Sequence, residues 1–312
     1  MRVDFWGVRG SIPTPLTTEQ IQAKIQAVVQ RISVQDLKNQ DSRQAFLDNL
    51  PSWLNGTVGG NTSCVSITNE KGTNFILDAG SGIRLLGKNP IAKNQKVFHI
   101  FFSHFHWDHI QGLPFFDPFF NPNVQLHFYS PKENLKFWLE DQCKSPYFPV
   151  DMKKMNQKNM FFHTIKEDEP LIIDNTKISC KQMFHPDDSF SFSFEELGKK
   201  IIYATDVELK QNIFSNNAFL TFFNNADLLI LDSQYTATEA VQKENWGHSS
   251  FSHALDFSSL CNIKKLFLFH HEPMYDDKKL YSILNNTKMY ADYSNSKITF
   301  IDLAKEGQSV IV

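Results

Sequence analysis

Four side chains that can bind a metal ion occur within six positions of the sequence, directly after an apolar stretch. They are His104, His106, Asp108 and His109. Zinc, iron and manganese accept imidazole nitrogen and carboxylate oxygen as ligands. Four such groups would be costly to bury without a cation. The run therefore predicts a metal centre in which His104 and His106 share one ion while Asp108 and His109 face a second.

An irregular turn is the expected setting for this run. Neighbouring side chains diverge in a regular strand or helix, so the consecutive ligands Asp108 and His109 favour a loop that curls. Apolar patterning predicts a strand over residues 96–103 before the run and a helix near residues 110–113 after it. The run would thus lie at the end of a strand.

Three further candidate ligands also follow strand-like segments. His185 comes after residues 178–184, Asp206 after 201–205 and His270 after 266–269. Side chains at the ends of neighbouring strands can gather on one rim of a sheet. His271 adjoins His270, and spacing alone does not decide which of the two reaches the metal.

The elements that must position these residues are short strands in both halves of the chain, with helices between some of them. Strands are predicted over 2–8, 124–129, 171–173, 177–183, 191–194, 200–204, 227–231 and 265–269, with a hairpin over 64–68 and 74–77. Helices are predicted over 132–142 and from Ser249 or Ser250 to Leu260, with serine as the N-cap. Such a pattern favours an α/β fold in which two sheets form a sandwich covered by helices. No Pro/Gly linker divides the chain, so residues 1–312 are predicted to form a single domain.

A helical insertion is predicted near the N-terminus. Over residues 17–55, Ile21, Ile25, Val28, Val29 and Ile32 recur at helical spacing. The mixed charge of this segment suits self-packing or a contact in a homodimer.

Composition restricts the partners and the compartment. The formal charge of the 312 residues is −3, and acidic and basic stretches are interleaved, so no basic face for DNA is expected. No stretch is apolar enough for a signal peptide or a membrane span. The four cysteines are far apart and form no C-x-x-C pair, which predicts free thiols. We therefore expect a soluble, cytoplasmic protein whose partner is a small anionic substrate.

The order of these motifs resembles the metallo-β-lactamase superfamily over nearly the whole chain. The run H-x-H-x-D-H, a later His, an Asp and a last His occur in the order of that superfamily. Four segments resemble its ribonuclease Z-like branch, which includes cyclic-nucleotide phosphodiesterases: 6–13 (WGVRGSIP), 59–64 (GGNTSC), 77–82 (LDAGSG) and 106–114 (HWDHIQGLP). The resemblance implies a four-layer αββα sandwich. One departure is the segment 185–190 (HPDDSF), which lacks the glycine-rich stretch common after this histidine.

The same resemblance implies a ligand set for two divalent metal ions, zinc in the first place, with manganese or iron as alternatives. The first ion would be bound by His104, His106 and His185, the second by Asp108, His109 and His270, and Asp206 would bridge them. His270 is favoured over His271, which would then support the site or face the substrate. Asp78, in the 77–82 segment, would hold a ligand histidine; the alternative is a turn or N-cap residue.

A further group of residues is predicted to act on the substrate. His248 resembles the general acid of the branch, because a neutral imidazole near pH 7 can protonate a leaving alkoxide; the alternative is a histidine that only packs at a helix start. Arg9 and Arg84 lie beside glycine-rich turns and could grip phosphate through paired hydrogen bonds, or form structural ion pairs. Tyr147 lies in the aromatic segment 145–149, within a candidate lid over residues 131–160 that could offer a ring to a base.

These residues predict a dinuclear metal-dependent phosphodiesterase. Two ions about 3.5–4 Å apart would lower the pKa of a bridging water and leave hydroxide in position to attack phosphorus. His248, Asp206 and Asp108 are the predicted catalytic residues, and His248 would protonate the leaving oxygen. The expected substrate is a 3′,5′-cyclic nucleotide (cAMP or cGMP), opened to the nucleoside 5′-monophosphate. The alternatives are tRNA 3′-end processing, which needs a long basic arm, β-lactamase or thioesterase activity on the same fold, and a non-catalytic metal-binding protein.

Overall fold

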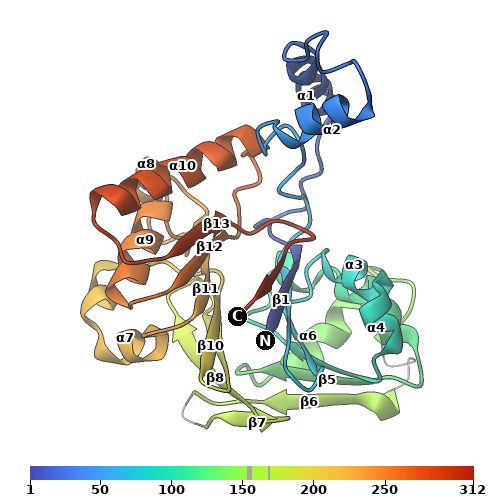
Figure 1. Cartoon of the computed structure of the whole chain (residues 1–312). Coiled ribbons are helices and arrows are strands. Elements are labelled where there is room, and N and C mark those ends of the chain that lie inside the picture. The colour runs from blue at the N-terminus through green and yellow to red at the C-terminus, as the bar shows by residue number, and fades with distance from the viewer. Residues whose placement is uncertain (153–156, 168) are drawn as a thin grey trace.

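Two seven-stranded sheets lie face to face in the computed structural model, which describes residues 1–152, 157–167 and 169–312 (Figure 1). The strands of the first sheet, in spatial order, are β14 (Ser309–Ile311), β1 (Arg2–Gly7), β2 (Cys64–Thr68), β3 (Asn74–Leu77), β4 (Val97–Phe101), β5 (Gln125–Ser130) and β6 (Met160–Thr164). Those of the second sheet are β13 (Phe300–Leu303), β12 (Lys265–Phe269), β11 (Leu228–Asp232), β10 (Lys199–Ala204), β9 (Ser189–Glu196), β8 (Thr176–Met183) and β7 (Leu171–Ile173). Both sheets are mixed, because β3–β6 and β10–β13 run parallel while the remaining neighbours are antiparallel.

Helices cover the outer faces of both sheets. On the first sheet these are α3 (Ile83–Lys88), α4 (Pro90–Asn94) and α6 (Leu135–Gln142); near the second lie α7 (Asn217–Phe223), α8 (Ala237–Gln242), α9 (Phe251–Leu260) and α10 (Asp277–Tyr293). Short 3₁₀ turns connect other elements: Leu113–Phe115, Asp117–Phe120, Gln157–Asn159 and Gln211–Ser215. The predicted αββα sandwich is confirmed. Among the described residues, no helix is long and apolar enough to cross a membrane.

The alternation along β9 shows how the sequence builds the inner core. In the stretch SFSFSF, Phe192 and Phe194 are fully buried and pack edge-on against Phe101 of the opposite sheet, with ring centroids 5.6 Å apart in both pairs. A period of two places successive side chains on opposite faces, so the phenylalanines, at every second position, share the face that enters the sandwich. Truncating such a ring to alanine costs about 3–5 kcal/mol, so this core holds the loops above it on a rigid platform.

The predicted strands and the predicted helix after Ser250 are confirmed. The Ser250 hydroxyl accepts from the His253 amide and caps α9. One expectation about the metal-binding run was wrong: α5 (Trp107–Ile110) begins three residues earlier than predicted, so Asp108 and His109 lie on a single helical turn. The turn is so short that both side chains still reach the same side of the loop. All four cysteines are buried, and the predicted free thiols are confirmed for Cys64, Cys143 and Cys261.

The predicted insertion contains two helices that stand away from the sandwich (Figure 1). They are α1 (Thr18–Val29) and α2 (Gln40–Asp48), each begun by a capping box and neither with a buried side chain. Ile21, Ile25 and Val29 of α1 are exposed. A homodimer contact through this segment stays a prediction.

The base of this two-helix arm is fixed to the sandwich. The Thr14 amide donates to the Gly60 carbonyl (2.7 Å), which joins the chain where it leaves and where it returns. A Cβ at position 60 would lie 2.4 Å from the Thr14 oxygen, so only glycine permits this approach. Lys24 donates to the carbonyls of Trp53 and Gly56 and pairs with Asp277 at the start of α10.

The candidate lid over residues 131–160 falls partly on residues 153–156, which lie outside the described residues. Its described part consists of α6, the aromatic segment after it, and the start of β6.

Candidate active site

The candidate site lies where strands of both sheets end. The loop after β4 supplies His104 to His109, and the ends of β8, β10 and β12 supply His185, Asp206 and His270. Asp206 and His270 have left-handed backbones, with φ of 51° and 58°. Non-glycine residues adopt this conformation only when the surrounding structure holds them there, and such positions concentrate at functional sites. The sharp turns bring side chains from distant parts of the sequence to one place.

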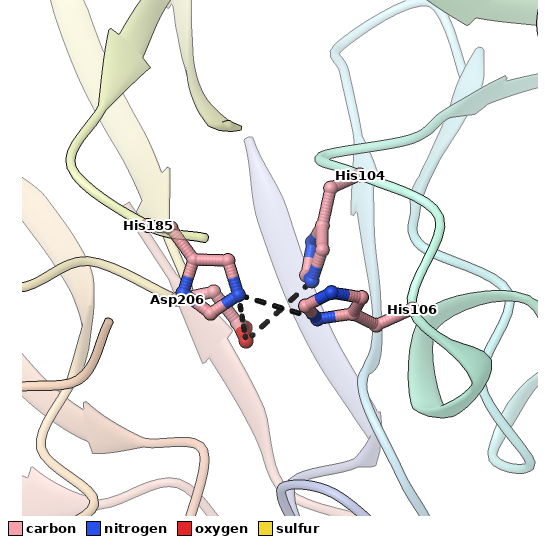
Figure 2. Close-up of side chains that lie close together, drawn as sticks. All are labelled: His104, His106, His185 and Asp206. Atoms are coloured by element: carbon pink, nitrogen blue, oxygen red, sulfur yellow. Dashed lines mark hydrogen bonds and ion pairs between the residues drawn. The ribbon is translucent and has the colours of Figure 1, made fainter. Parts of the chain in front are cut away.

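The first cluster consists of His104, His106, His185 and Asp206, whose ligand atoms all lie within 4.8 Å of one another (Figure 2). His185 Nε2 is 3.2 Å from His106 Nδ1. The Nε2 atoms of His104 and His185 are each 3.7 Å from Asp206 Oδ1. These four donor atoms face a common point.

The second cluster consists of Asp108, His109 and His270, again within 4.8 Å. Asp108 Oδ2 lies 3.2 Å from His109 Nε2 and 3.1 Å from His270 Nε2. Asp206 Oδ2 lies 3.1 Å and 3.2 Å from the same two nitrogens. Asp206 therefore presents one oxygen to each cluster, the arrangement that a bridging carboxylate requires.

Hydrogen bonds on the far side of the rings aim the Nε2 atoms into the clusters. Asp78 Oδ2 accepts from His109 Nδ1 (2.8 Å) and from the Ser103 hydroxyl (2.8 Å), which in turn accepts from His104 Nδ1 (3.0 Å). Asp78 also accepts from the Ser103 amide and from the Tyr203 hydroxyl, both at 2.8 Å. A ring that donates through Nδ1 keeps the Nε2 lone pair free for a metal. The contact predicted for Asp78 is thus present.

The rings of His185 and His270 are oriented in the same way. His185 Nδ1 donates to the Gly247 carbonyl (3.0 Å), and His270 Nδ1 donates to Gln234 Oε1 (3.3 Å). Gly247 has φ of 88°, and a Cβ there would lie 2.1 Å from His185 Nδ1. Glycine at this position is therefore needed for His185 to stay in place.

Divalent cations fit this set of side chains. His104 Nε2 and His109 Nε2 are buried and have no hydrogen-bond partner within the part of the chain that the structure describes. An unpaired buried nitrogen is costly, and a cation would satisfy both at once. Burial also lowers the pKa of His104 and of His185, which keeps these imidazoles neutral, the form that binds metal.

The carboxylates are held in their charged form. Burial acts to raise the pKa of Asp108, but the histidines around it, His109 first, lower it well below its usual range. The pKa of Asp206 is likewise lowered against burial by His270, His109 and His104. The effect is mutual: burial acts to lower the pKa of His109 and of His270, but Asp108 and Asp206 raise it above its usual value. The second cluster therefore holds charged carboxylates beside imidazoles that bind protons, and a divalent cation would take the place of those protons.

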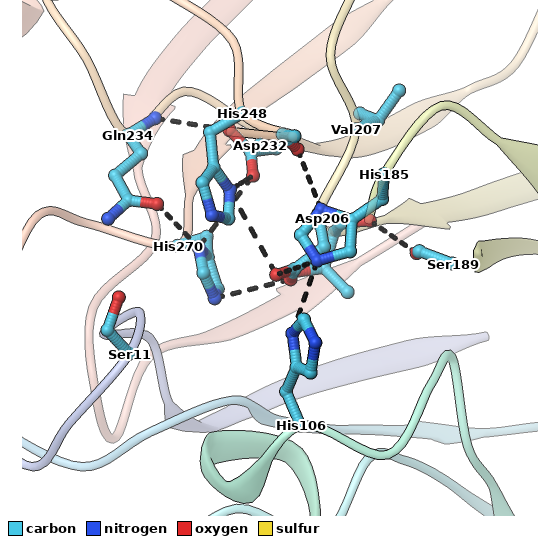
Figure 3. Close-up of polar contacts among 12 residues, drawn as sticks. Ser11, His106, His185, Ser189, Asp206, Val207, Asp232, Gln234, His248 and His270 are labelled. Carbon is cyan, nitrogen blue, oxygen red and sulfur yellow. Dashed lines mark hydrogen bonds and ion pairs between the residues drawn. The ribbon is translucent and has the colours of Figure 1, made fainter. Parts of the chain in front are cut away.

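His248 lies beside both clusters and is oriented by a carboxylate (Figure 3). Its Nδ1 donates to Asp232 Oδ2 (2.7 Å) and is 4.0 Å from Asp206 Oδ1. Asp232 is fully buried, and its other oxygen accepts from the amides of Ser249 (3.0 Å) and Gln234 (3.2 Å). Because Asp232 fixes Nδ1 as a donor, Nε2 is the nitrogen left to exchange a proton with a bound molecule.

Asp232 and Ser11 were not predicted. Asp232 ends β11, so it shares the strand-end position that pointed to Asp206 and His270, and that signal could have found it. Ser11 donates its amide to Asp108 Oδ2 (2.8 Å) from a left-handed backbone (φ 59°). Ser11 belongs to the 6–13 segment. It acts through its backbone amide, so the type of its side chain could not reveal the contact.

A cavity of about 500 Å³ opens onto the clusters; we call it the metal pocket. It is lined by Ser11, Phe105, His106, Trp107, Asp108, Asp206, His248 and His270. No lysine or arginine is among these described lining residues.

The prediction that Arg9 binds substrate was wrong. Arg9 is 2% exposed, and its guanidinium donates to the carbonyls of Gly59 (2.8 Å), Tyr275 (2.8 Å) and Glu272 (3.1 Å). Its donors are therefore used to hold loops together behind the site. The alternative of a structural arginine is the better description.

His271 points away from the clusters. Its Nε2 donates to the Ala304 carbonyl (2.9 Å), and burial lowers its pKa to about 3. His270 is therefore the histidine of this pair that reaches the metal-binding atoms, and His271 neither binds a metal nor faces substrate.

Three other residues singled out from the sequence lie at or beyond the rim. Arg84 is exposed on α3, and within the described part of the chain no hydrogen bond or ion pair links it to the site, so its role stays a prediction. Asp187, in the unusual HPDDSF segment, lies 3.8 Å from His106 Nε2 and is largely exposed. Tyr147 is exposed beside a second cavity, and its role also stays a prediction.

Comparisons with known proteins agree with this geometry. Residues 73–271 match the model of the "Beta-lactamase superfamily domain". A ribonuclease Z of Prochlorococcus marinus (strain MIT 9515) is 25% identical over 287 residues, which cover 72% of this chain and 89% of that protein. The fold is similar to that of the metallo-β-lactamase fold protein YhfI from Bacillus subtilis (TM-score 0.64, 14% identity, 99% of this chain and 98% of that one). It is also similar to that of human tRNase Z, short form (TM-score 0.62, 18% identity, 100% and 99%). The chain belongs to the metallo-β-lactamase superfamily, in its ribonuclease Z-like branch.

Proposed function

We propose that this protein is a metal-dependent phosphodiester hydrolase. The observation that carries the proposal is the position of His248, which is held by Asp232 at the edge of the seven converging side chains and lines the same pocket. Metal-dependent hydrolysis of a diester uses cations at the phosphoryl group and benefits from a proton donor for the leaving oxygen. Both face one cavity in this fold.

Two divalent ions, zinc in the first place with manganese or iron as alternatives, would be held by His104, His106, His185, Asp108, His109, His270 and Asp206. Bound there, they would supply positive charge for phosphoryl oxygens and make a water molecule more acidic. The metal pocket has no lysine or arginine among its described lining residues, so the substrate's negative charge would meet the cations alone. Ser11 and Asp78 keep Asp108 and His109 in place for this task.

His248 is the proposed general acid. With Nδ1 donating to Asp232, a proton on Nε2 can pass to the departing oxygen, and the buried carboxylate stabilises the protonated ring until it does so. The oxygen of a water molecule forms the new bond to phosphorus as the ester oxygen leaves. Atoms and protons balance, because the water proton lost on attack restores the proton that His248 gives up.

The proposed substrate is a 3′,5′-cyclic nucleotide, whose P–O3′ bond would break to give the nucleoside 5′-monophosphate. The metal pocket is of a size typical for small-molecule sites. The two-helix arm offers no basic surface for RNA, since residues 17–55 balance four acidic side chains against four basic ones: Glu19, Asp36, Asp41 and Asp48 against Lys24, Arg31, Lys38 and Arg43. The cytoplasm is part of the proposal, supported by the buried free thiols of Cys64, Cys143 and Cys261.

A second candidate is tRNA 3′-end processing. The similarity to a curated protein named ribonuclease Z favours it, because the metal chemistry would be the same. Binding of a metal without hydrolysis is the third candidate.

One panel ranks these candidates. Metal-loaded protein would be tested on cAMP, cGMP, bis(p-nitrophenyl) phosphate and a precursor tRNA, with metal analysis of the same sample. We expect about two ions per chain and hydrolysis of the cyclic nucleotides, with no cleavage of the tRNA. Cleavage of the tRNA at its 3′ side would favour the second candidate, and metal without any hydrolysis would favour the third.

A further inference from the structure

We infer that an aromatic cavity beside the metal pocket binds the base of a nucleotide; the identification as a nucleotide rests on the proposed function. This cavity has a volume of about 710 Å³ and lies under α6 and the segment that follows it. Its aromatic walls are Phe105, Trp107, Phe115, Trp138, Tyr147 and Phe148. We call it the aromatic cavity.

The aromatic cavity adjoins the metal pocket. Phe105 and Trp107 line both, and they flank His106 of the first cluster in the sequence. A ligand whose phosphate lies at the clusters therefore extends past these two rings into the aromatic cavity. No separate opening is needed for the rest of the molecule.

The walls of the aromatic cavity suit a flat ring. Trp107 is 82% exposed, Tyr147 75% and Phe115 55%. Large aromatic side chains left open to water around one cavity mark a binding surface, because their burial releases free energy only when a ligand arrives. Phe105 packs on Trp138 (centroids 4.6 Å apart), and Phe148 packs edge-on against the open ring of Phe115 (5.8 Å), so packed rings support the wall behind the open ones.

The polar groups of the aromatic cavity match a base rather than a phosphate. No lysine or arginine is among its described lining residues, and its charged lining residue, Asp141, is paired with Lys144, so the cavity offers no free cation to a phosphate. Gln142 also lines it, and the amide nitrogen of this side chain is buried without a partner among the described residues. If this side chain turns its buried amide nitrogen toward the cavity, the N–H can donate to a ring nitrogen or carbonyl of a base.

The test compares two probes that differ only in the base. Metal-loaded protein would be titrated with adenosine 5′-monophosphate and with ribose 5-phosphate, and binding followed by calorimetry. We expect the nucleotide to bind about 5- to 150-fold more tightly, the range for stacking of one base. In Tyr147→Ala this ratio should fall several-fold. Tyr293→Ala, which removes an equally exposed tyrosine at the end of α10, should keep the wild-type ratio.

Equal affinity for the two probes in the wild-type protein would overturn the inference, as would an unchanged ratio in Tyr147→Ala. Gln142→Leu gives a second measurement, since loss of the amide donor should change the order of affinity among adenosine, guanosine and uridine monophosphates. These titrations do not depend on turnover. If the protein prefers the nucleotide but hydrolyses no diester, the base site stands and the proposed function fails. If it hydrolyses a diester but binds the two probes equally, the proposed function stands and the base site fails.

Discussion

Two regions of the first sheet and its loops are rich in histidine, and they behave differently. In the strands, His99, His127 and His163 form a row of rings: His127 stacks on His163 (centroids 5.3 Å apart), and His99 lies tilted against His127 (5.1 Å). Their nitrogens pair within the stack, His127 with His163 (3.1 Å) and His99 with the Tyr129 hydroxyl (2.9 Å). In the loop after β4, histidines converge with carboxylates instead of stacking. Among the described residues, the metal-competent groups all gather around that loop, where His185, Asp206, His248 and His270 reach it from the other half of the sandwich.

The difference comes from the backbone beneath the rings. Neighbouring strands hold side chains side by side at a fixed spacing, which favours flat packing of rings. Strand ends followed by left-handed residues such as Asp206 and His270 turn their side chains toward a point. Histidines therefore make a candidate metal centre through the turns that hold them, and their number alone does not distinguish the two regions.

The largest effect is expected from Asp206→Ala. Both clusters lose an oxygen, so metal content should fall from about two ions toward none, and hydrolysis by roughly 10⁴-fold. His127→Gln in the stack is the matched control and should retain metal and activity. Metal analysis and initial rates on bis(p-nitrophenyl) phosphate would check both. Loss of metal in His127→Gln would remove the distinction between the two regions.

His248→Ala should lower kcat by about 10²–10⁴-fold while both ions stay bound, because His248 gives a proton and is not needed to hold a cation. The loss should be smaller for a p-nitrophenolate leaving group, which departs without protonation. Comparing a p-nitrophenyl ester with a cyclic nucleotide measures this difference. An equal loss on both substrates would contradict the role of general acid.

Asp78→Asn should weaken metal binding by about 10–100-fold, since the hydrogen bond that orients His109 and increases its basicity is weakened. Competition with a chelator gives the affinity. As a control, Asp174→Asn changes a carboxylate that pairs with Thr73 far along the sheet and should leave the affinity unchanged. Unaltered affinity in Asp78→Asn would show that His109 does not depend on this contact.

The smallest effect concerns acid stability of the histidine stack. Burial lowers the pKa of His99 to about 4. Between that value and the unfolded pKa near 6.5, the unfolded chain binds a proton that the folded chain does not, so stability is lost as the pH falls through this window. In His99→Phe, the drop in Tm from pH 7 to pH 4.5 should be smaller than in wild type, both measured with chelator present. An equal drop would show that this ring does not titrate as its burial implies.

Much of the fold could be predicted from the sequence because its signals are local. The alternating serines and phenylalanines of β9 and the serine cap of α9 determine their elements over a few residues. The convergence of the seven candidate ligands could be predicted because each follows a strand. Their roles as metal ligands stay predictions until an ion is measured.

The features that could not be predicted from the sequence depend mostly on contacts between residues far apart in the chain. Arg9 lies in a motif that suggests anion binding, yet its donors are used by carbonyls of residues up to Tyr275, which spacing does not reveal. The start of α5 three residues early was missed because a single helical turn has no periodicity to detect. Asp232 ends a buried strand, and this position could have marked it as a candidate. Its hydrogen bond to His248, 16 residues further along the chain, could not be predicted from spacing.

The narrow base of the two-helix arm, where its two ends are joined by a backbone hydrogen bond, has a practical consequence. Thr14 and Gly60 close it with one hydrogen bond, and neither α1 nor α2 buries a side chain. Residues 30–39, which connect the two helices, lie at the far end from this closure. A reporter or an affinity tag inserted there would extend into solvent without disturbing the cation-binding loops, so this tip is a suitable point for labelling the protein or attaching it to a surface.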